Sequence, residues 1–190
     1  LTKKASLVIM KHINSLQTDK DLAADSQPMS RKRPIRSNAT DGLSESGILI
    51  IEDGPVHTRI TELLLSNNGF RNLLTAQSYQ DTQAVISNSY QHDETAIDLI
   101  IIDMMTQGLD ALNLCKELHQ TESLTEVPIL LISPSIDWYE EAVSAGLNAG
   151  ALDIVFKPLQ QHNIIPRILT LLQLKKERDT SRSKQTQLES

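Results

Sequence analysis

The chain has 190 residues, of which 39% are hydrophobic and 22% charged, and its formal net charge is −6. This length and composition fit one soluble globular domain with solvated flanking segments. The negative charge disfavours general nucleic-acid binding through a basic surface. The single cysteine, Cys115, excludes an internal disulfide framework and suits a reducing cytoplasm. No apolar run approaches the ~20 residues that a membrane-spanning helix needs.

Residues 1–45 are mostly polar and differ in character from the rest of the chain. Within the first 20 residues, an apolar residue recurs at helical spacing, which is a weak amphipathic pattern: Ala5, Ile9, Ile13 and Leu16. A linker is predicted next, and its basic cluster at 31–36 is read as a solvated charge run. Because the chain begins with Leu rather than Met, we expect a piece of a longer polypeptide. Residues 1–45 are then an N-terminal helix and flexible linker, or the tail of an upstream domain.

From Gly47 onward, short apolar runs alternate with segments of helical periodicity. The apolar runs predict five strands, over residues 48–51, 72–76, 97–102, 127–132 and 153–156. Helical spacing predicts five helices, over residues 55–68, 80–89, 108–120, 138–147 and from Pro158 onward. This alternation implies right-handed crossovers and a parallel sheet covered on both faces. Residues 176–190 are predicted to be a polar C-terminal connector, without the apolar seam of a coiled coil.

Side chains suited to phosphoryl chemistry follow four of the predicted strands. In chain order they are Glu52 and Asp53, Asp103, Ser133, and Lys157. Because the carboxyl ends of parallel strands lie along one edge of a sheet, we expect these groups to converge. Clustered carboxylates repel one another unless a cation joins them, and their oxygen atoms suit Mg²⁺. The pattern therefore predicts an acidic, magnesium-binding edge.

Each of these residue types has a role in phosphoryl transfer. Asp103 can attack phosphorus to form an acyl phosphate. Lys157 can pair with one phosphoryl oxygen while the Ser133 hydroxyl donates a hydrogen bond to another. Taken singly, these residues are more simply turn formers, helix caps or a surface lysine. Their occurrence at all four strand ends is what favours a functional site.

Four segments resemble the signatures of receiver domains of bacterial two-component response regulators: ILIIEDGP, DLIIIDMM, VPILLISPS and ALDIVFKPL. Their order matches the family, and so does the spacing between Asp103 and Ser133. The resemblance covers residues 46–175 and implies a three-layer, flavodoxin-like (βα)5 fold with strand order 2-1-3-4-5.

The resemblance also implies the roles of the site residues. Asp103 would be the phosphoacceptor in a phosphorelay, modified by a histidine kinase or a phosphotransfer protein. Asp53, Asp103 and the backbone carbonyl of Met105 would hold Mg²⁺, with Glu52 acting through water. The Lys157–Pro158 peptide bond is expected to be cis.

Several wider expectations follow from the same resemblance. The segment would catalyse only its own phosphorylation and dephosphorylation, with no turnover enzyme encoded. It would be cytoplasmic and would regulate an attached or partner output domain. A homodimer through the helices expected at 138–147 and after Pro158 is a further expectation. No helix-turn-helix segment follows the domain, so direct nucleic-acid binding is not expected.

The switch region departs from the family pattern. Pro134 follows Ser133 where receivers have a small residue, so a backbone N–H donor is missing. Ile154 occupies the position of the aromatic switch residue, three residues before Lys157. Thr106-Gln107 replaces the usual Met-Pro. Pro134 and Ile154, in a switch region that ends at Pro158, favour an alternative: a degenerate receiver acting as a constitutive protein-interaction module. The intact acidic residues, Ser133 and Lys157 favour the phosphorylation-controlled switch.

An enzymatic alternative is a phosphatase of the haloacid dehalogenase type, which also uses Mg²⁺, an aspartate nucleophile, a hydroxyl and a lysine. Such enzymes need a second aspartate two positions after the nucleophile as general acid and base. That position is Met105 here, and the acidic pair after the first strand would have no role. The pattern therefore favours the receiver.

Overall fold

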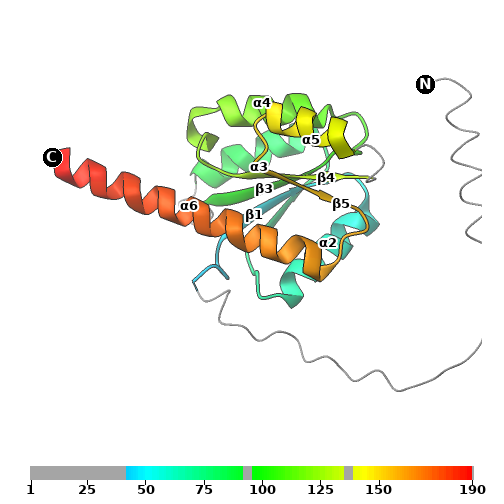
Figure 1. The fold of residues 1–190 in the computed structure, drawn as a ribbon, viewed down its shortest axis with the longest axis horizontal. Helices are drawn as coiled ribbons and strands as arrows, with labels where there is room; N and C mark the ends of the chain where they lie inside the picture. Colours follow the sequence, from blue (N-terminus) through cyan, green and yellow to red (C-terminus); the bar gives the residue numbers. More distant parts are fainter. Residues whose placement is uncertain (1–41, 92–95, 135–138, 190) are drawn as a thin grey trace, which may run out of the picture. The chain divides into compact units, whose positions relative to one another are not determined.

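The computed structural model describes residues 42–91, 96–134 and 139–189. A five-stranded parallel sheet forms its centre, with helices on both faces (Figure 1). The strands are β1 (Gly47–Ile51), β2 (Leu73–Ala76), β3 (Ile97–Asp103), β4 (Ile129–Ser133) and β5 (Asp153–Phe156). Their order in the sheet is β2-β1-β3-β4-β5, which confirms the three-layer topology that the resemblance implied.

The five α-helices of the described residues divide between the two faces of the sheet. They are α2 (Pro55–Asn67), α3 (Tyr79–Gln91), α4 (Ala111–Gln120), α5 (Tyr139–Asn148) and α6 (Gln161–Glu189), with a short 3-10 turn, η2 (Glu122–Leu124), after α4. One hydrophobic core joins α3 and α4 to the sheet, and a second joins α2 and α6 to its other face. In Figure 1, α4 and α5 accordingly lie above the sheet, and α6 and α2 lie below it.

Burial on both faces explains the continuous apolar runs of the strands. Side chains alternate between the faces of a strand, so successive residues enter different cores. In β1, Leu49 and Ile51 belong to the α3–α4 core, whereas Ile48 and Ile50 belong to the α2–α6 core. All four are at most 1% exposed. A parallel sheet covered by helices on both sides requires this pattern.

Local chemistry sets several helix boundaries. Pro55 lies in the first turn of α2, where its missing N–H costs no helical hydrogen bond. The helix predicted from residue 108 begins only at Ala111, because the Asp110 side chain caps it by accepting a hydrogen bond from the Asn113 N–H. Gly108 lies before this cap with a φ of 69°, a left-handed conformation that glycine adopts readily.

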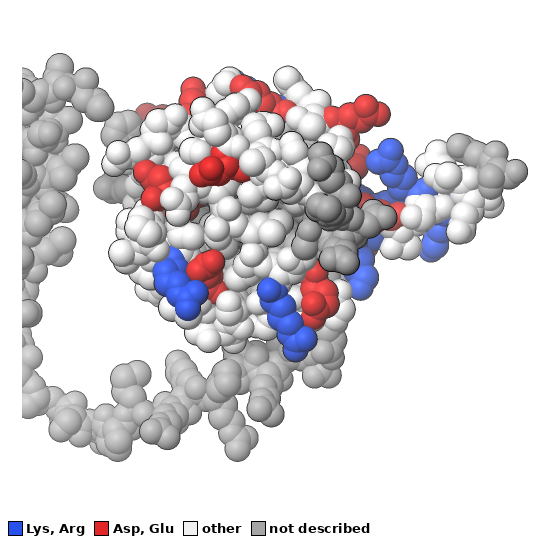
Figure 2. Space-filling view, turned by 180° about the vertical axis from the view of Figure 1, so that it is seen from behind, with Lys and Arg blue, Asp and Glu red and all other residues white. Residues whose placement is uncertain are grey.

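The last helix is longer than the domain needs. The segment predicted as a polar connector is helical through Glu189, and α6 projects from the body of the domain (Figure 1). An ion pair of 3.6 Å between Arg178 and Glu126 connects this part of α6 to the loop before β4. Figure 2 shows Lys and Arg side chains along the projecting helix, whereas those on the domain body are scattered and lie beside acidic residues.

The described structure extends slightly beyond the predicted start of the domain at residue 46. Leu43 is only 5% exposed and belongs to the α2–α6 core. The predicted helix within residues 1–20, the basic cluster at 31–36 and Trp138 lie outside the described residues. Of the helices that the structure describes, none is long and apolar enough to cross a membrane.

Candidate functional site

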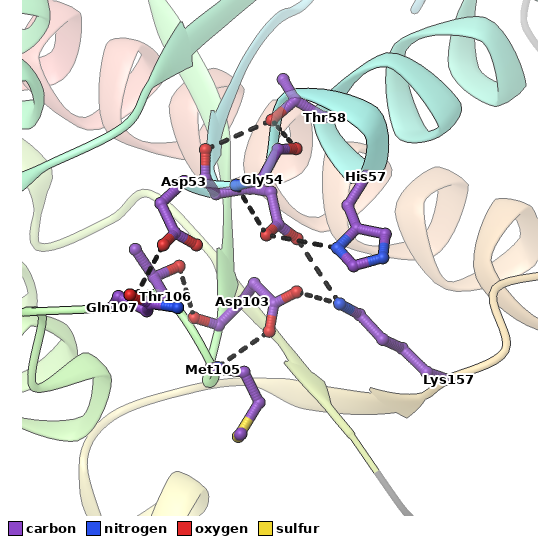
Figure 3. Close-up of polar contacts among 10 residues, drawn as sticks. Asp53, Gly54, His57, Thr58, Asp103, Met105, Thr106, Gln107 and Lys157 are labelled. Atoms are coloured by element: carbon purple, nitrogen blue, oxygen red, sulfur yellow. Dashed lines mark hydrogen bonds and ion pairs between the residues drawn. The ribbon is translucent and has the colours of Figure 1, made fainter. Parts of the chain in front are cut away.

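The predicted site residues lie at one edge of the sheet, where the carboxyl ends of the strands meet. Asp103 and Ser133 are the last residues of β3 and β4. Glu52 and Asp53 follow β1 directly, and Lys157 follows β5. The parallel register brings these ends together, since Ile51 pairs with Ile102 across β1 and β3. Figure 3 shows Asp53, Asp103 and Lys157 gathered at this edge.

Asp103 is the most deeply buried of the acidic side chains, with no exposed side-chain surface. Its Oδ1 atom accepts a hydrogen bond of 2.9 Å from the Met105 backbone N–H. Its Oδ2 atom is in contact with the Lys157 ammonium group, although no described residue gives this buried oxygen a hydrogen bond of regular geometry. Lys157 also lies 3.5 Å from Oε2 of Glu52, so one ammonium group faces two carboxyl groups.

The pKa values of the Glu52 and Asp103 carboxyl groups are shifted in opposite directions. Burial raises the pKa of Glu52 to about 7, and hydrogen bonding to Asp103 and repulsion by it act in the same direction. Burial would also raise the pKa of Asp103, but its interactions with Glu52 and Lys157 and the hydrogen bond from the Met105 N–H hold it below its ordinary value. Near neutral pH, burial and the neighbouring Asp103 therefore favour the protonated form of Glu52 more than is usual for a glutamate. Burial opposes the charge on Lys157, yet its contacts with Asp103 raise its pKa.

Glu52 is held in place by the first turn of α2. Its Oε1 atom accepts a hydrogen bond of 3.3 Å from the Gly54 N–H, and its backbone carbonyl accepts one of 3.2 Å from the Thr58 hydroxyl. His57 Nδ1 lies 3.8 Å from the same Oε1 atom (Figure 3). The sequence reasoning missed His57. Its position five residues after Glu52, within a helix beginning at Pro55, was the available signal.

Asp53 makes a different contact from the other two acidic residues. Its Oδ2 atom accepts a hydrogen bond of 3.0 Å from the backbone N–H of Gln107, in the loop between β3 and α4. Figure 3 shows the Asp53 carboxylate turned toward Gln107. The same loop is anchored by Thr106, whose hydroxyl and N–H both donate to the Asp103 carbonyl. This contact was also missed by the sequence reasoning.

The remaining predicted positions lie around this centre. Ser133 is 1% exposed, and its carbonyl accepts a hydrogen bond of 2.9 Å from the Lys157 N–H. The Lys157–Pro158 peptide bond is cis, as predicted. Ile154 is buried in the α3–α4 core, and Pro134 is exposed directly after β4.

The site contains oxygen donors that suit a divalent cation. Within residues 42–91, 96–134 and 139–189, no three His, Cys, Asp or Glu side chains are placed to hold a metal together. Mg²⁺ does not require three, because it takes one or two carboxylates and keeps several waters. Asp103 Oδ2, buried without a regular hydrogen bond, and the Asp53 carboxylate fit that donor chemistry.

Comparison with known proteins decides the family. The sequence model of the family described as "Response regulator receiver domain" matches residues 48–169. The chain belongs to the response regulator receiver domain family. This membership places it among the domains of two-component signalling systems and removes the haloacid dehalogenase alternative.

Several response regulators are similar to this receiver domain. It is 32% identical over 133 residues to the response regulator ArlR of Staphylococcus aureus strain Mu50, and 28% identical over 134 residues to that of Staphylococcus haemolyticus. These matches cover 70% of this chain but only 55% and 56% of the relatives. The chain thus spans about half the length of the curated relatives that it matches.

Solved structures show the same likeness. The receiver domain of NtrX from Brucella abortus is 28% identical, with a TM-score of 0.57 and coverage of 66% of this chain and 98% of that domain. The chemotaxis response regulator CheY4 of Vibrio cholerae has a TM-score of 0.56 and covers 67% of this chain and 98% of its own. Since it is only 16% identical, it supports the fold alone.

Proposed function

We propose that this receiver domain accepts a phosphoryl group on Asp103 from a phosphohistidine of a histidine kinase or phosphotransfer protein. The observation that carries the proposal is the contact at the end of the sheet between the buried Asp103 and Lys157, whose ammonium group also lies 3.5 Å from Glu52. Burying charged groups together costs free energy of desolvation. A cluster of perturbed titratable groups in such a position is typical of a functional site rather than of a stabilising one.

The reaction is a transfer between two nucleophiles. A carboxylate oxygen of Asp103 forms a bond to phosphorus as the bond from phosphorus to the imidazole nitrogen breaks, and the electron pair returns to that nitrogen. Lys157 is positioned to balance charge on the phosphoryl oxygens. Ser133, at the end of the neighbouring strand, would donate its hydroxyl to another of them. Hydrolysis of the acyl phosphate would return Asp103 to its starting state. The segment would therefore catalyse only its own phosphorylation and dephosphorylation, and would not turn over a separate substrate.

We propose Mg²⁺ as the cofactor of this reaction. Asp53, Asp103 and the Met105 carbonyl would hold the ion, and Glu52 would act through water. When bound, the ion supplies positive charge that offsets the charge of the phosphoryl group. The oxygen donors of Asp53 and Asp103 support this assignment.

A degenerate, constitutive interaction module is the second candidate, and two observations favour it. Pro134 has no N–H to offer a phosphoryl group. Ile154 is buried at the switch position and packs closely beneath α5, since a Cβ atom built on Gly146 would lie 2.6 Å from its Cδ1 atom. A signal would then have to pass through the loop after β4 and through α5.

The wider role is also a proposal. We propose residues 46–175 as the receiver unit, with 1–45 and 176–190 connecting it to an output domain of the full-length protein or to a partner. We further propose that the domain dimerises through α5 and α6, that it is cytoplasmic, and that it makes no direct contact with nucleic acid. The long α6 supports the connecting role, because a continuous helix transmits position over its length.

Phosphorylation of the intact chain tests this function. The unmodified chain and the Asp103→Asn variant are each incubated with a small acyl-phosphate donor and MgCl₂. The mass of each protein is measured before and after the incubation. We expect the gain of one phosphoryl group, lost in the variant and in the presence of a chelator. No gain in the unmodified chain would favour the constitutive module, and a gain that survives Asp103→Asn would contradict the assignment of the acceptor.

A further inference from the structure

The contact between Gln107 and Asp53 joins two ends of the site that are far apart in the chain. The Gln107 N–H donates to Oδ2 of Asp53 at 3.0 Å, across a separation of 54 residues. Three successive backbone N–H groups of the β3–α4 loop point back at the site: those of Met105 and Thr106 donate to Asp103, and that of Gln107 donates to Asp53. The loop therefore bridges β3 and β1 through its backbone.

This bridge depends on the residue type at position 107. A proline there, as in the Met-Pro pair that Thr106-Gln107 replaces, has no N–H and could not make the hydrogen bond. Thr106 fixes the preceding residue to the Asp103 carbonyl, and Gly108 turns the chain with a φ of 69°. The backbone on both sides of Gln107 thus holds its N–H toward Asp53.

The bridge has a consequence for cation binding. The Gln107 N–H occupies Oδ2 of Asp53, one of the carboxylate oxygens that a cation at this edge would use. A cation that takes Oδ2 of Asp53 as a ligand would therefore have to displace the Gln107 N–H from it. A hydrogen bond to an ionised carboxylate is stronger than one between neutral groups, so releasing it opposes binding.

We propose that the backbone N–H of Gln107 is a positioning group that competes with Mg²⁺ for Asp53. This inference rests on the proposed function, because it takes Asp53 as a ligand of the ion. Release of Asp53 on metal binding also frees Gln107, so the loop from Met104 to Asp110, which leads into α4, responds to occupancy of the site. Metal binding is thereby coupled to the start of α4 without any aromatic switch residue.

A pair of variants at one position separates the backbone N–H from the side chain. Gln107→Pro removes the donor, whereas Gln107→Ala shortens the side chain and keeps the donor. Calorimetric titration of each 190-residue variant with MgCl₂ measures the affinity without any phosphorylation. Because the hydrogen bond is exposed to water, we expect Gln107→Pro to bind Mg²⁺ about three- to tenfold more tightly. Gln107→Ala should bind like the unmodified chain.

A measurement on the unmodified chain removes the dependence on how the proline variant folds. The Gln107 amide proton is followed by NMR during the same MgCl₂ titration. We expect a hydrogen-bonded shift and slow exchange without the ion, and loss of both as the site fills.

The outcomes distinguish the bridge from the proposed function. Two results would overturn the competition between Gln107 and Mg²⁺ and leave the receiver function standing. The first is Mg²⁺ binding that leaves the Gln107 amide signal unchanged. The second is equal Mg²⁺ affinity of the proline and alanine variants. Failure of every variant to bind Mg²⁺ overturns the metal assignment, and the competition with it. Tighter binding by Gln107→Pro alone supports both.

Discussion

Glu52 makes the stability of the metal-free domain depend on pH in a predictable way. Its pKa is raised from 4.5 to about 7 in the folded chain, chiefly by burial and then by the neighbouring Asp103. The folded protein therefore holds this proton more tightly than the unfolded chain does. The resulting contribution to stability is complete below pH 4.5 and is lost as the pH rises through about 7.

The size of the effect follows from the shift. One pKa unit corresponds to about 1.4 kcal/mol, so the full change in unfolding free energy is at most about 3–4 kcal/mol. The other two groups of the cluster titrate outside this range of pH. The pKa of Asp103 is lowered from 3.8, and that of Lys157 is raised from 10.5. Within this cluster, the loss between about pH 5 and pH 8 is therefore assigned to Glu52.

Urea unfolding in the presence of a chelator measures this loss. We expect the unfolding free energy of the unmodified chain to fall across that range, and that of Glu52→Gln to fall much less. Glu45→Gln is the matched control, because the Glu45 side chain is 72% exposed and its loss should leave the pH slope unchanged. Equal slopes for the unmodified chain and Glu52→Gln would refute the reasoning. Saturating MgCl₂ should restore part of the lost stability near pH 8, because a bound cation favours ionised Glu52.

Three further predictions concern packing and reactivity. Gly146→Ala would place a methyl group 2.6 Å from Ile154 Cδ1 and 2.9 Å from Leu131 Cδ1, so we expect a loss of about 1–2 kcal/mol that Ile154→Val relieves in part. Additive losses in a double-mutant cycle would contradict this contact. Burial raises the pKa of the Cys115 thiol to about 11, so reaction with an aromatic disulfide reagent should require unfolding, and rapid labelling of the folded chain would be contrary evidence. Leu43→Ala should cost about 2–3 kcal/mol in urea unfolding, and an unchanged midpoint would place Leu43 outside the core.

The local pattern of the sequence determined the elements of this fold and the order of the site residues. Apolar runs such as Ile48–Ile51 predict strands because a residue buried on either face of a parallel sheet must be apolar. Glu52, Asp103 and Lys157 could be assigned to one edge because parallel strands end on the same side. The strand order, by contrast, came from resemblance to a family. The hydrophobic periodicity of the sequence indicates which face of a strand or helix is buried, but not which strands lie next to one another in the sheet.

Tertiary structure alone decided which polar groups meet. Asp53 belongs to the predicted acidic cluster, yet it faces the Gln107 N–H, a donor that every residue except proline carries and that no motif marks. Leu43 enters the core from a segment assigned to the linker, and α6 continues well past its last buried leucine. These contacts depend on how the packed elements place backbone groups and side chains that are distant in sequence. Local propensity holds no information about such distances, and only the folded chain sets them.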